Sequence, residues 1–102
     1  LTWDDTVATA AMTRSKEIEK SFSHTRPDGR NFGTAITDLG ITYRGAGENI
    51  AWGQKTPEAV MNAWMNSEGH RANILNPNFK KLGVGYRTDS QRTPYWTQLF
   101  TY

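Results

Sequence analysis

The chain has 102 residues, a length typical of a single domain that buries a substantial core. Its net charge is only +2, and its basic residues are scattered, which argues against a nucleic-acid-binding surface. The absence of cysteine excludes disulfides, thiolate catalysis and cysteine-ligated zinc. No run approaches the roughly 18 apolar residues of a membrane span, so we expect a soluble domain without a transmembrane segment.

The first segment, residues 2–20, has the apolar periodicity of a helix. The side chains on its apolar stripe are Val7, Ala11, Ile18 and Phe22. Thr2 with Asp5 three residues later resembles a capping box, which predicts that the helix begins at Thr2. The sequence Pro-Asp-Gly at 27–29 predicts a type I turn, so His24 is expected just past a helix end.

The middle of the chain predicts a short helix followed by a strand. The helix is expected over 32–39 and ends at Gly40. Gly45 and Gly47 then make an irregular approach to 48–52, where apolar residues alternate as in a strand.

A clearer helix begins at Pro57, with Thr56 as its capping residue. Four residues are predicted to share one face of this helix, namely Val60, Ala63, Trp64 and Ser67. Gly69 interrupts the pattern, and Ser67 is in position to cap a second short helix that runs to Leu75 and ends at 76–78.

Two alternating segments, 81–87 and 95–102, predict an antiparallel hairpin with a polar loop at 88–93. Gly83 and Gly85 leave one face of its first strand bare, which favours close packing of a helix there. With no repeat or second domain visible, the sequence predicts one α+β domain with a central antiparallel sheet covered by helices.

Three residues are candidates for chemistry. His24 and His70 are the only histidines, and each lies at a helix break. Glu48 lies where the chain enters an apolar run, so its carboxylate needs donors or a cation. Each also has a structural interpretation: the histidines as capping or surface groups, and Glu48 as a residue that holds a loop through backbone N–H groups.

Two neighbours of His70 extend this set. Ser67 lies three residues before it and shares its helix face, whereas Glu68 lies two residues before it and faces elsewhere unless the segment is irregular. Ser67, His70 and Glu48 suggest a hydrolytic triad, but no G-x-S-x-G sequence surrounds the serine. No compact zinc or calcium motif is present either.

Five ordered blocks of the sequence closely resemble the bacterial branch of the CAP superfamily. They are residues 22–29, 47–51, 64–75, 82–85 and 95–98. That superfamily groups cysteine-rich secretory proteins, antigen 5 and pathogenesis-related 1 proteins. The resemblance covers nearly the whole chain and implies an α-β-α sandwich in a secreted or cell-envelope protein. It also implies a cleft with two histidines and two acidic residues, which in several animal members binds a divalent metal such as zinc.

Carried over by position, His24 matches the family's first histidine and Glu48 the acid of its Gly-Glu-Asn motif. Ser67 stands where eukaryotic members have their second acid, and the block at 94–98 lacks their second histidine. His70 is instead typical of the bacterial Ser-x-Gly-His pattern. The expected metal ligands are therefore His24, Glu48 and His70. Related domains usually carry a further helix before the first block, so the single domain 1–102 is expected to lack that helix.

Three functions follow from the resemblance. The first is a non-catalytic binding or effector module with a lipid, glycan or protein ligand. The second is a metal-assisted hydrolase or protease-like enzyme in which three protein ligands leave an open metal position. The third is a structural cell-wall or spore-coat module in which the polar cluster only stabilises the fold. The sequence leaves the ligand and the oligomeric state open.

Overall fold

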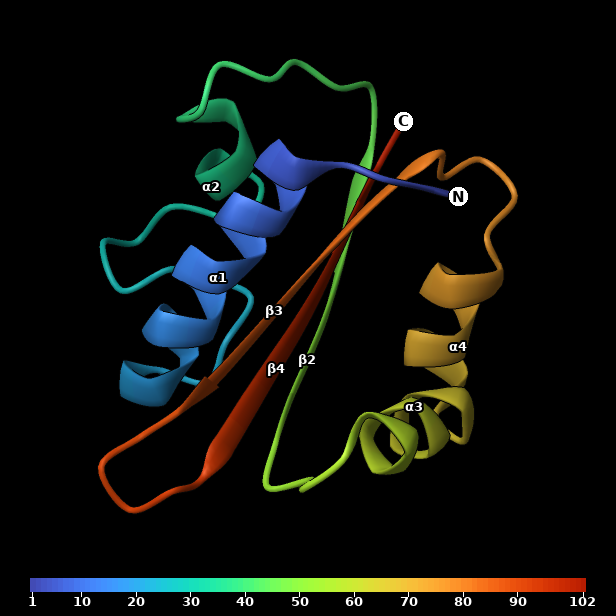
Figure 1. Ribbon diagram of the computed structural model, residues 1–102. Helices are drawn as coiled ribbons and strands as arrows, with labels where there is room; N and C mark the ends of the chain where they lie inside the picture. The colour runs from blue at the N-terminus through green and yellow to red at the C-terminus, as the bar shows by residue number, and fades with distance from the viewer.

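The computed structural model describes residues 1–102 as four strands and four helices. In chain order these are β1 (Thr2–Trp3), α1 (Asp5–Lys20), α2 (Thr34–Thr37), β2 (Ala46–Trp52), α3 (Pro57–Met65), α4 (Glu68–Leu75), β3 (Lys81–Thr88) and β4 (Pro94–Thr101). Helices α1 and α2 lie on one side of the sheet, and α3 and α4 lie on the other (Figure 1). The chain is therefore an α+β sandwich, as the sequence predicts.

The sheet has the strand order β1-β3-β4-β2. Strands β2, β4 and β3 pair antiparallel, in agreement with the predicted hairpin and central sheet. The short strand β1 pairs parallel with β3, with Thr2 N donating to Lys80 O at 2.8 Å. The sheet is therefore mixed, and this parallel edge has no signal in the local sequence.

The predicted start of the first helix at Thr2 is wrong by three residues, because α1 begins at Asp5. Thr2 lies in β1, and Asp4 is the N-cap of α1, where its carboxylate accepts hydrogen bonds from Thr6 N and Val7 N at 2.9 Å each. Asp5, the expected second half of a capping box, instead accepts from the indole of Trp3. Pairing of Thr2 with β3 overrides the local capping signal.

Helix α1 packs directly on the sheet through β3. A Cβ atom on Gly83 would lie 2.2 Å from Ala8 N, and one on Gly85 would lie 2.3 Å from Ala11 O, so only glycine permits this approach. The side chains that α1 buries are Val7, Ala10, Ala11, Arg14, Ser15 and Ile18. Phe22, which the sequence placed on the apolar stripe of this helix, lies beyond the end of α1 and is half exposed.

Helix α2 is shorter than the predicted 32–39, because the flanking residues form turns with hydrogen bonds between residues three apart. Gly40 ends this segment with φ of +85°, as expected. The Pro-Asp-Gly turn also forms, with Gly29 N donating to Arg26 O at 2.8 Å.

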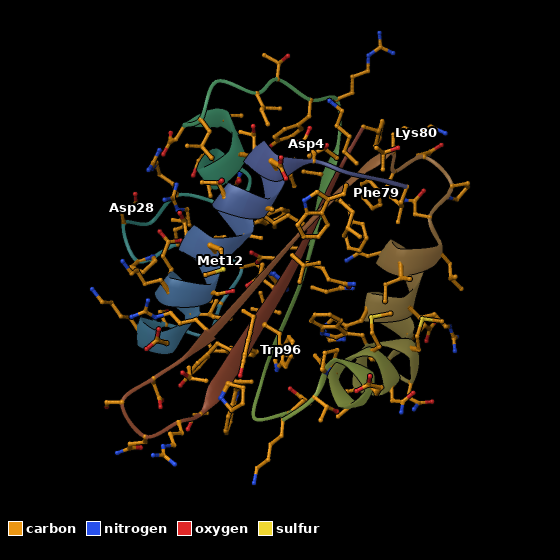
Figure 2. The ribbon with its side chains drawn as sticks, in the orientation of Figure 1. Asp4, Met12, Asp28, Phe79, Lys80 and Trp96 are labelled. Atoms are coloured by element: carbon orange, nitrogen blue, oxygen red, sulfur yellow. The ribbon has the colours of Figure 1, made fainter.

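The second helical layer is attached more lightly. In α3 only Val60 and Trp64 are buried, and they pack with Ala51 and Trp96 of the sheet. Trp96 lies between the sheet and α3, and its indole donates to Gln54 O at 2.8 Å (Figure 2). Ala63, predicted on the same face, is exposed. Helix α4 buries no residue fully; Ile74 packs half-buried against the same cluster, and polar contacts supply the rest of the attachment.

Candidate functional site

A buried ion pair joins α1 to β2. Arg14 and Glu48 both have fully buried side chains, with Arg14 Nε 2.6 Å from Glu48 Oε2 and Arg14 Nη2 3.2 Å from Oε1. This two-pronged contact is the strongest geometry available to a guanidinium and a carboxylate. Burial alone would lower the pKa of Arg14, but its hydrogen bonds to Glu48 and Glu17 outweigh that effect and raise it. Glu48 therefore has the cation that its burial requires.

His24 occupies the other side of the same carboxylate. Its Nδ1 lies 2.8 Å from Glu48 Oε1, while its side chain is 60% exposed. Because a carboxylate paired with arginine can only accept, Nδ1 carries a hydrogen and donates it to Oε1. Both oxygens of Glu48 are thus occupied, and His24 presents the accessible surface of this cluster.

The loop that carries His24 is fastened to the helices on its side of the sheet. Arg26 donates to Glu17 and to Asp38 at 2.9 and 3.2 Å. Burial would raise the pKa of Glu17, but hydrogen bonds from Arg26 and Arg14 outweigh it and lower that pKa. The backbone N–H of Phe32 closes the loop by donating to His24 O at 2.9 Å. The position of His24 is therefore set by an ion-pair network, not by a helix end alone.

His70 lies in the first turn of α4, where its Nδ1 is 2.9 Å from Ser67 Oγ. Ser67 is the N-cap residue, as predicted, but its hydroxyl contacts the histidine instead of a backbone N–H. Burial, followed by the nearby positive charge of His24, lowers the pKa of His70 below its ordinary value of 6.5. Near neutral pH this imidazole is uncharged. Glu68 is exposed at the start of α4.

An amide network connects α4 to the buried carboxylate. Asn49 is fully buried, and its Nδ2 donates to His70 O at 3.1 Å and to Gln98 Oε1 at 3.0 Å. Asn73 Nδ2 in turn donates to Asn49 Oδ1 at 2.9 Å and to Glu48 O at 3.3 Å. Because α4 buries no side chain, these bonds fix the position of His70 relative to β2.

His24, Ser67 and His70 line one pocket of about 460 Å³. Its other walls are mainly apolar and come from the segment before His24, β2 and α3; they include Phe22, Ile50, Ala51, Trp52 and Trp64. Gln54 also lines the pocket, and its Oε1 is a buried acceptor without a hydrogen-bond partner. Glu48 lies beneath His24, away from the pocket surface.

The structure brings His24 and Glu48 into contact and places His70 on the same pocket, but His70 does not touch Glu48. No group of three His, Asp or Glu side chains is arranged to hold a metal ion. Arg14 occupies the carboxylate that the expected three-ligand set needs, and its positive charge disfavours a cation beside it. The residues present do not fit the metal centre that the resemblance implies.

Sequence reasoning missed Arg14 and the amides Asn49, Asn73 and Gln98. Arg14 had a signal, because it lies three residues after Ala11 on the buried stripe of α1, where a charged residue needs a partner. The amides had no signal in periodicity or capping, since polar residues in a strand or helix are ordinarily solvent-exposed; their signal was that all three lie in the blocks that carry the family resemblance.

Comparisons with known proteins place this geometry in a family. The model of the CAP family, described as the cysteine-rich secretory protein family, matches residues 1–100. Two proteins of Bacillus subtilis (strain 168) are similar. The uncharacterized protein YkwD is 48% identical over 99 residues, covering 95% of this chain and 37% of that protein. The uncharacterized membrane protein YlbC is 33% identical over 102 residues, covering 98% of this chain and 28% of that protein.

Solved structures show the same fold. An extracellular protein containing an SCP domain from Bacillus anthracis has a TM-score of 0.89 and 36% identity over 99% of this chain and 33% of that chain. An outer surface protein from Borrelia burgdorferi has a TM-score of 0.88 and 23% identity over 99% of this chain and 76% of that chain. This chain spans about a third of the curated relatives' length. None of its helices combines the length and apolarity needed to cross a membrane.

Proposed function

The chain belongs to the CAP, or cysteine-rich secretory protein, family, and from that premise we propose that it is a binding module of the extracellular space or cell envelope. The location is supported by two structural neighbours that are described as extracellular and outer-surface proteins. The proposed ligand site is the pocket shared by His24, Ser67 and His70.

Gln54 is the observation that carries this proposal. A buried polar atom without a partner costs about 1–3 kcal/mol, so folded proteins rarely keep one without a reason. The unpartnered Oε1 belongs to a residue of the largely apolar pocket wall, which both imidazoles also line. The atom itself is covered, so a ligand meets it when the Gln54 side chain turns toward the pocket. This combination suits a ligand with an apolar body and a neutral polar head that can both donate and accept hydrogen bonds. A lipid-like or acylated molecule with an amide or hydroxyl head has that chemistry.

The same geometry argues against Glu48 as a catalytic base. Its carboxylate is covered by His24 and held by Arg14, so no lone pair is directed at the pocket. Removing the Glu48 carboxylate would leave the buried Arg14 with Glu17 as its only carboxylate partner, which ties Glu48 to the stability of the fold.

One observation favours a hydrolase as the second candidate. Ser67 Oγ lies 2.9 Å from His70 Nδ1, and burial lowers the pKa of His70, so the ring is a neutral base near pH 7. No carboxylate orients this histidine, since Glu48 contacts His24 instead. A hydrolase would turn over p-nitrophenyl hexanoate, and Ser67→Ala would abolish the turnover. A binding module shows no turnover above the rate in buffer.

Hexanamide tests the binding proposal, because it has an apolar chain and a head that donates and accepts. N,N-dimethylhexanamide keeps the acceptor but lacks the donor. We expect hexanamide to shift the imidazole NMR signals of His24 and His70 with millimolar affinity, and the dimethyl compound to bind more weakly. Gln54→Met, which removes the unpartnered acceptor, should abolish that preference.

A pair of variants on α3 supplies the control. Ala63→Trp places a ring in the pocket, whereas Ala59→Trp places it on an exposed part of the same helix outside the pocket. Binding should be lost in the first variant and kept in the second. Hexanamide that shifts neither histidine signal, or that binds Ala63→Trp as well as the wild-type protein, would exclude this pocket as the ligand site.

A further inference from the structure

A second groove lies at the hairpin end of the sheet, outside the histidine pocket. The turn that follows β2 and the loop between β3 and β4 lie at the same end of the molecule (Figure 1). Between them is a groove of about 830 Å³ whose walls include Lys55, Tyr86 and Arg92. We propose that this groove binds an anionic glycan, with a sugar ring against Tyr86 and an acidic group between Lys55 and Arg92.

The two cations of the groove, Lys55 and Arg92, have no acidic partners. Neither Lys55 nor Arg92 takes part in any of the ion pairs of the chain, whereas most of the arginines do. No Asp or Glu lines the groove. Asp89, the acid of the hairpin loop, is engaged by Gln91 N and Thr93 N at 2.8 and 2.9 Å. The field of the two cations is therefore available to an anion from outside.

The floor of the groove is an exposed aromatic ring that is held rigid from behind. Tyr86 is 39% exposed and stacks on Trp96, with 4.4 Å between ring centroids and 21° between planes. Trp96 is itself fixed by packing in the core and by its hydrogen bond to Gln54 O. Trp52, 57% exposed, stands at the rim. Such an immobilised ring offers a flat apolar surface to the C–H face of a sugar at little entropic cost.

The rest of the wall distinguishes a glycan from an apolar or peptide ligand. Tyr86 and Trp52 are the only large apolar groups, and the remaining lining includes the side chains of Thr88, Gln91 and Thr93. Hydroxyl and amide groups both donate and accept, which matches the alternating donors and acceptors of a polyol. The groove has no continuous apolar surface for a lipid tail. A docked helix or strand would need a larger apolar contact area than Tyr86 and Trp52 provide.

Arg92 adds an independent sign of a functional position. It is the only non-glycine residue with positive φ, at 64°. An arginine in this conformation is energetically unfavourable by about 1 kcal/mol, a pattern that recurs at binding sites. The hydrogen bonds of Asp89 to the loop backbone hold the residue in that conformation. The loop thus presents the Arg92 side chain at the groove.

The experiment measures binding of defined oligosaccharides by isothermal titration calorimetry at low salt. The probes are an oligogalacturonate, its fully methyl-esterified form with the same sugars and no charge, a phosphomannan oligosaccharide, and polyglutamate as an anion without sugar. The variants are Tyr86→Ala and the pair Lys55→Gln with Arg92→Gly; glycine at 92 relieves the positive φ and protects the fold. The matched control is Arg44→Gln with Lys80→Gln, which removes two exposed cations away from the groove; Lys80 lies at the far end (Figure 2).

We expect the oligogalacturonate or the phosphomannan to bind, which identifies a carboxylate or a phosphate as the acidic group. Tyr86→Ala and the Lys55/Arg92 pair should each weaken binding about tenfold, and the Arg44/Lys80 pair less than about twofold. The methyl ester and polyglutamate should bind at least about tenfold more weakly. Equal losses in both cation pairs, equal binding of polyglutamate, or no binding of either charged glycan would overturn the proposal. The groove shares Trp52 with the histidine pocket, but none of the substituted residues lines that pocket, so these outcomes test the groove alone.

Discussion

At the scale of single residues, the contacts of the Glu48 carboxylate determine which chemistry the candidate site can support. It lies between a buried guanidinium and an exposed imidazole, and both of its oxygens are hydrogen-bonded. A buried ion pair of this kind adds little net stability over an apolar pair, but losing one member leaves a charge without a partner. Glu48 and Arg14 are therefore expected to behave as a unit.

Glu48→Gln tests this dependence. The substitution keeps the shape but removes the buried carboxylate of the pair and leaves Arg14 with Glu17 as its only carboxylate partner, so we expect the free energy of unfolding to fall by about 3 kcal/mol. Urea denaturation followed by far-UV circular dichroism measures the change. Glu68→Gln, at an exposed position, should remain within about 0.5 kcal/mol of the wild-type protein. An equally small effect at Glu48 would contradict the assigned role of the pair.

His70 predicts a dependence on pH. Burial and then the charge of His24 lower its pKa below 6.5, so the unfolded chain takes up a proton at higher pH than the folded chain. The stability contributed by the neutral ring is complete above pH 6.5 and is lost as the pH falls from 6.5 through the folded-state pKa. The ring signal of His70 should therefore titrate with a midpoint below 6.5 in NMR. His70→Gln should show a smaller fall in melting temperature between pH 8 and pH 5; identical falls would contradict this assignment.

At the scale of elements, the contact between α1 and β3 depends on two glycines. Backbone atoms of Val7 and Ala8 lie within 2.3 Å of where a Cβ of Gly83 would be, and backbone cannot move aside as a flexible side chain can. The helix would have to separate from the strand, with loss of the packing along its buried stripe.

Gly83→Ala is accordingly expected to destabilise the domain by at least about 3 kcal/mol, or to prevent folding. Gly69→Ala is the matched control, because nothing lies within 4 Å of its Cβ position in α4 and its φ is negative. That change should raise stability by about 0.5 kcal/mol through helix propensity. Thermal unfolding of both variants measures the contrast, and a tolerated alanine at 83 would refute the close-approach argument.

At the scale of the whole molecule, the two helical layers are unequally attached to the sheet. Helix α1 buries six residues, α3 buries two, and α4 buries none. The α3–α4 layer carries Ser67 and His70, so the wall of the histidine pocket belongs to the less firmly held layer. Ligand-binding elements are commonly drawn from the less stable part of a fold.

Native-state hydrogen exchange should resolve this difference. We expect amides of α4 to exchange through an opening with a lower free energy than amides of α1 and the three long strands, which should exchange through global unfolding. Asn49→Ala removes the amide that fastens α4 to β2, so it should speed exchange in α4 more than in α1. Equal opening free energies in both layers would show that the domain opens as a single unit.

Most of the contacts that are local in the chain follow from the sequence by itself. The stripe of α1, the helix that begins at Pro57, the turn at 27–29 and the antiparallel hairpin all follow from periodicity, capping and turn chemistry. Gly83 and Gly85 on β3 also predicted the close contact with a helix, because a strand face without side chains lets another backbone approach it. Residue chemistry and position in the chain named two histidines and one acid as candidates, and all three lie in the blocks that carry the family resemblance.

Only the tertiary structure decided the contacts that join distant segments. Thr2 enters the sheet beside Lys81, Arg14 meets Glu48, and Asn49 reaches both α4 and Gln98. These pairings depend on strand register and on how α1 lies across the sheet, and neither leaves a local pattern in the chain. For that reason the sequence could nominate Glu48 as a metal ligand, while the fold, by placing a buried arginine against it, removed the free carboxylate that a metal requires.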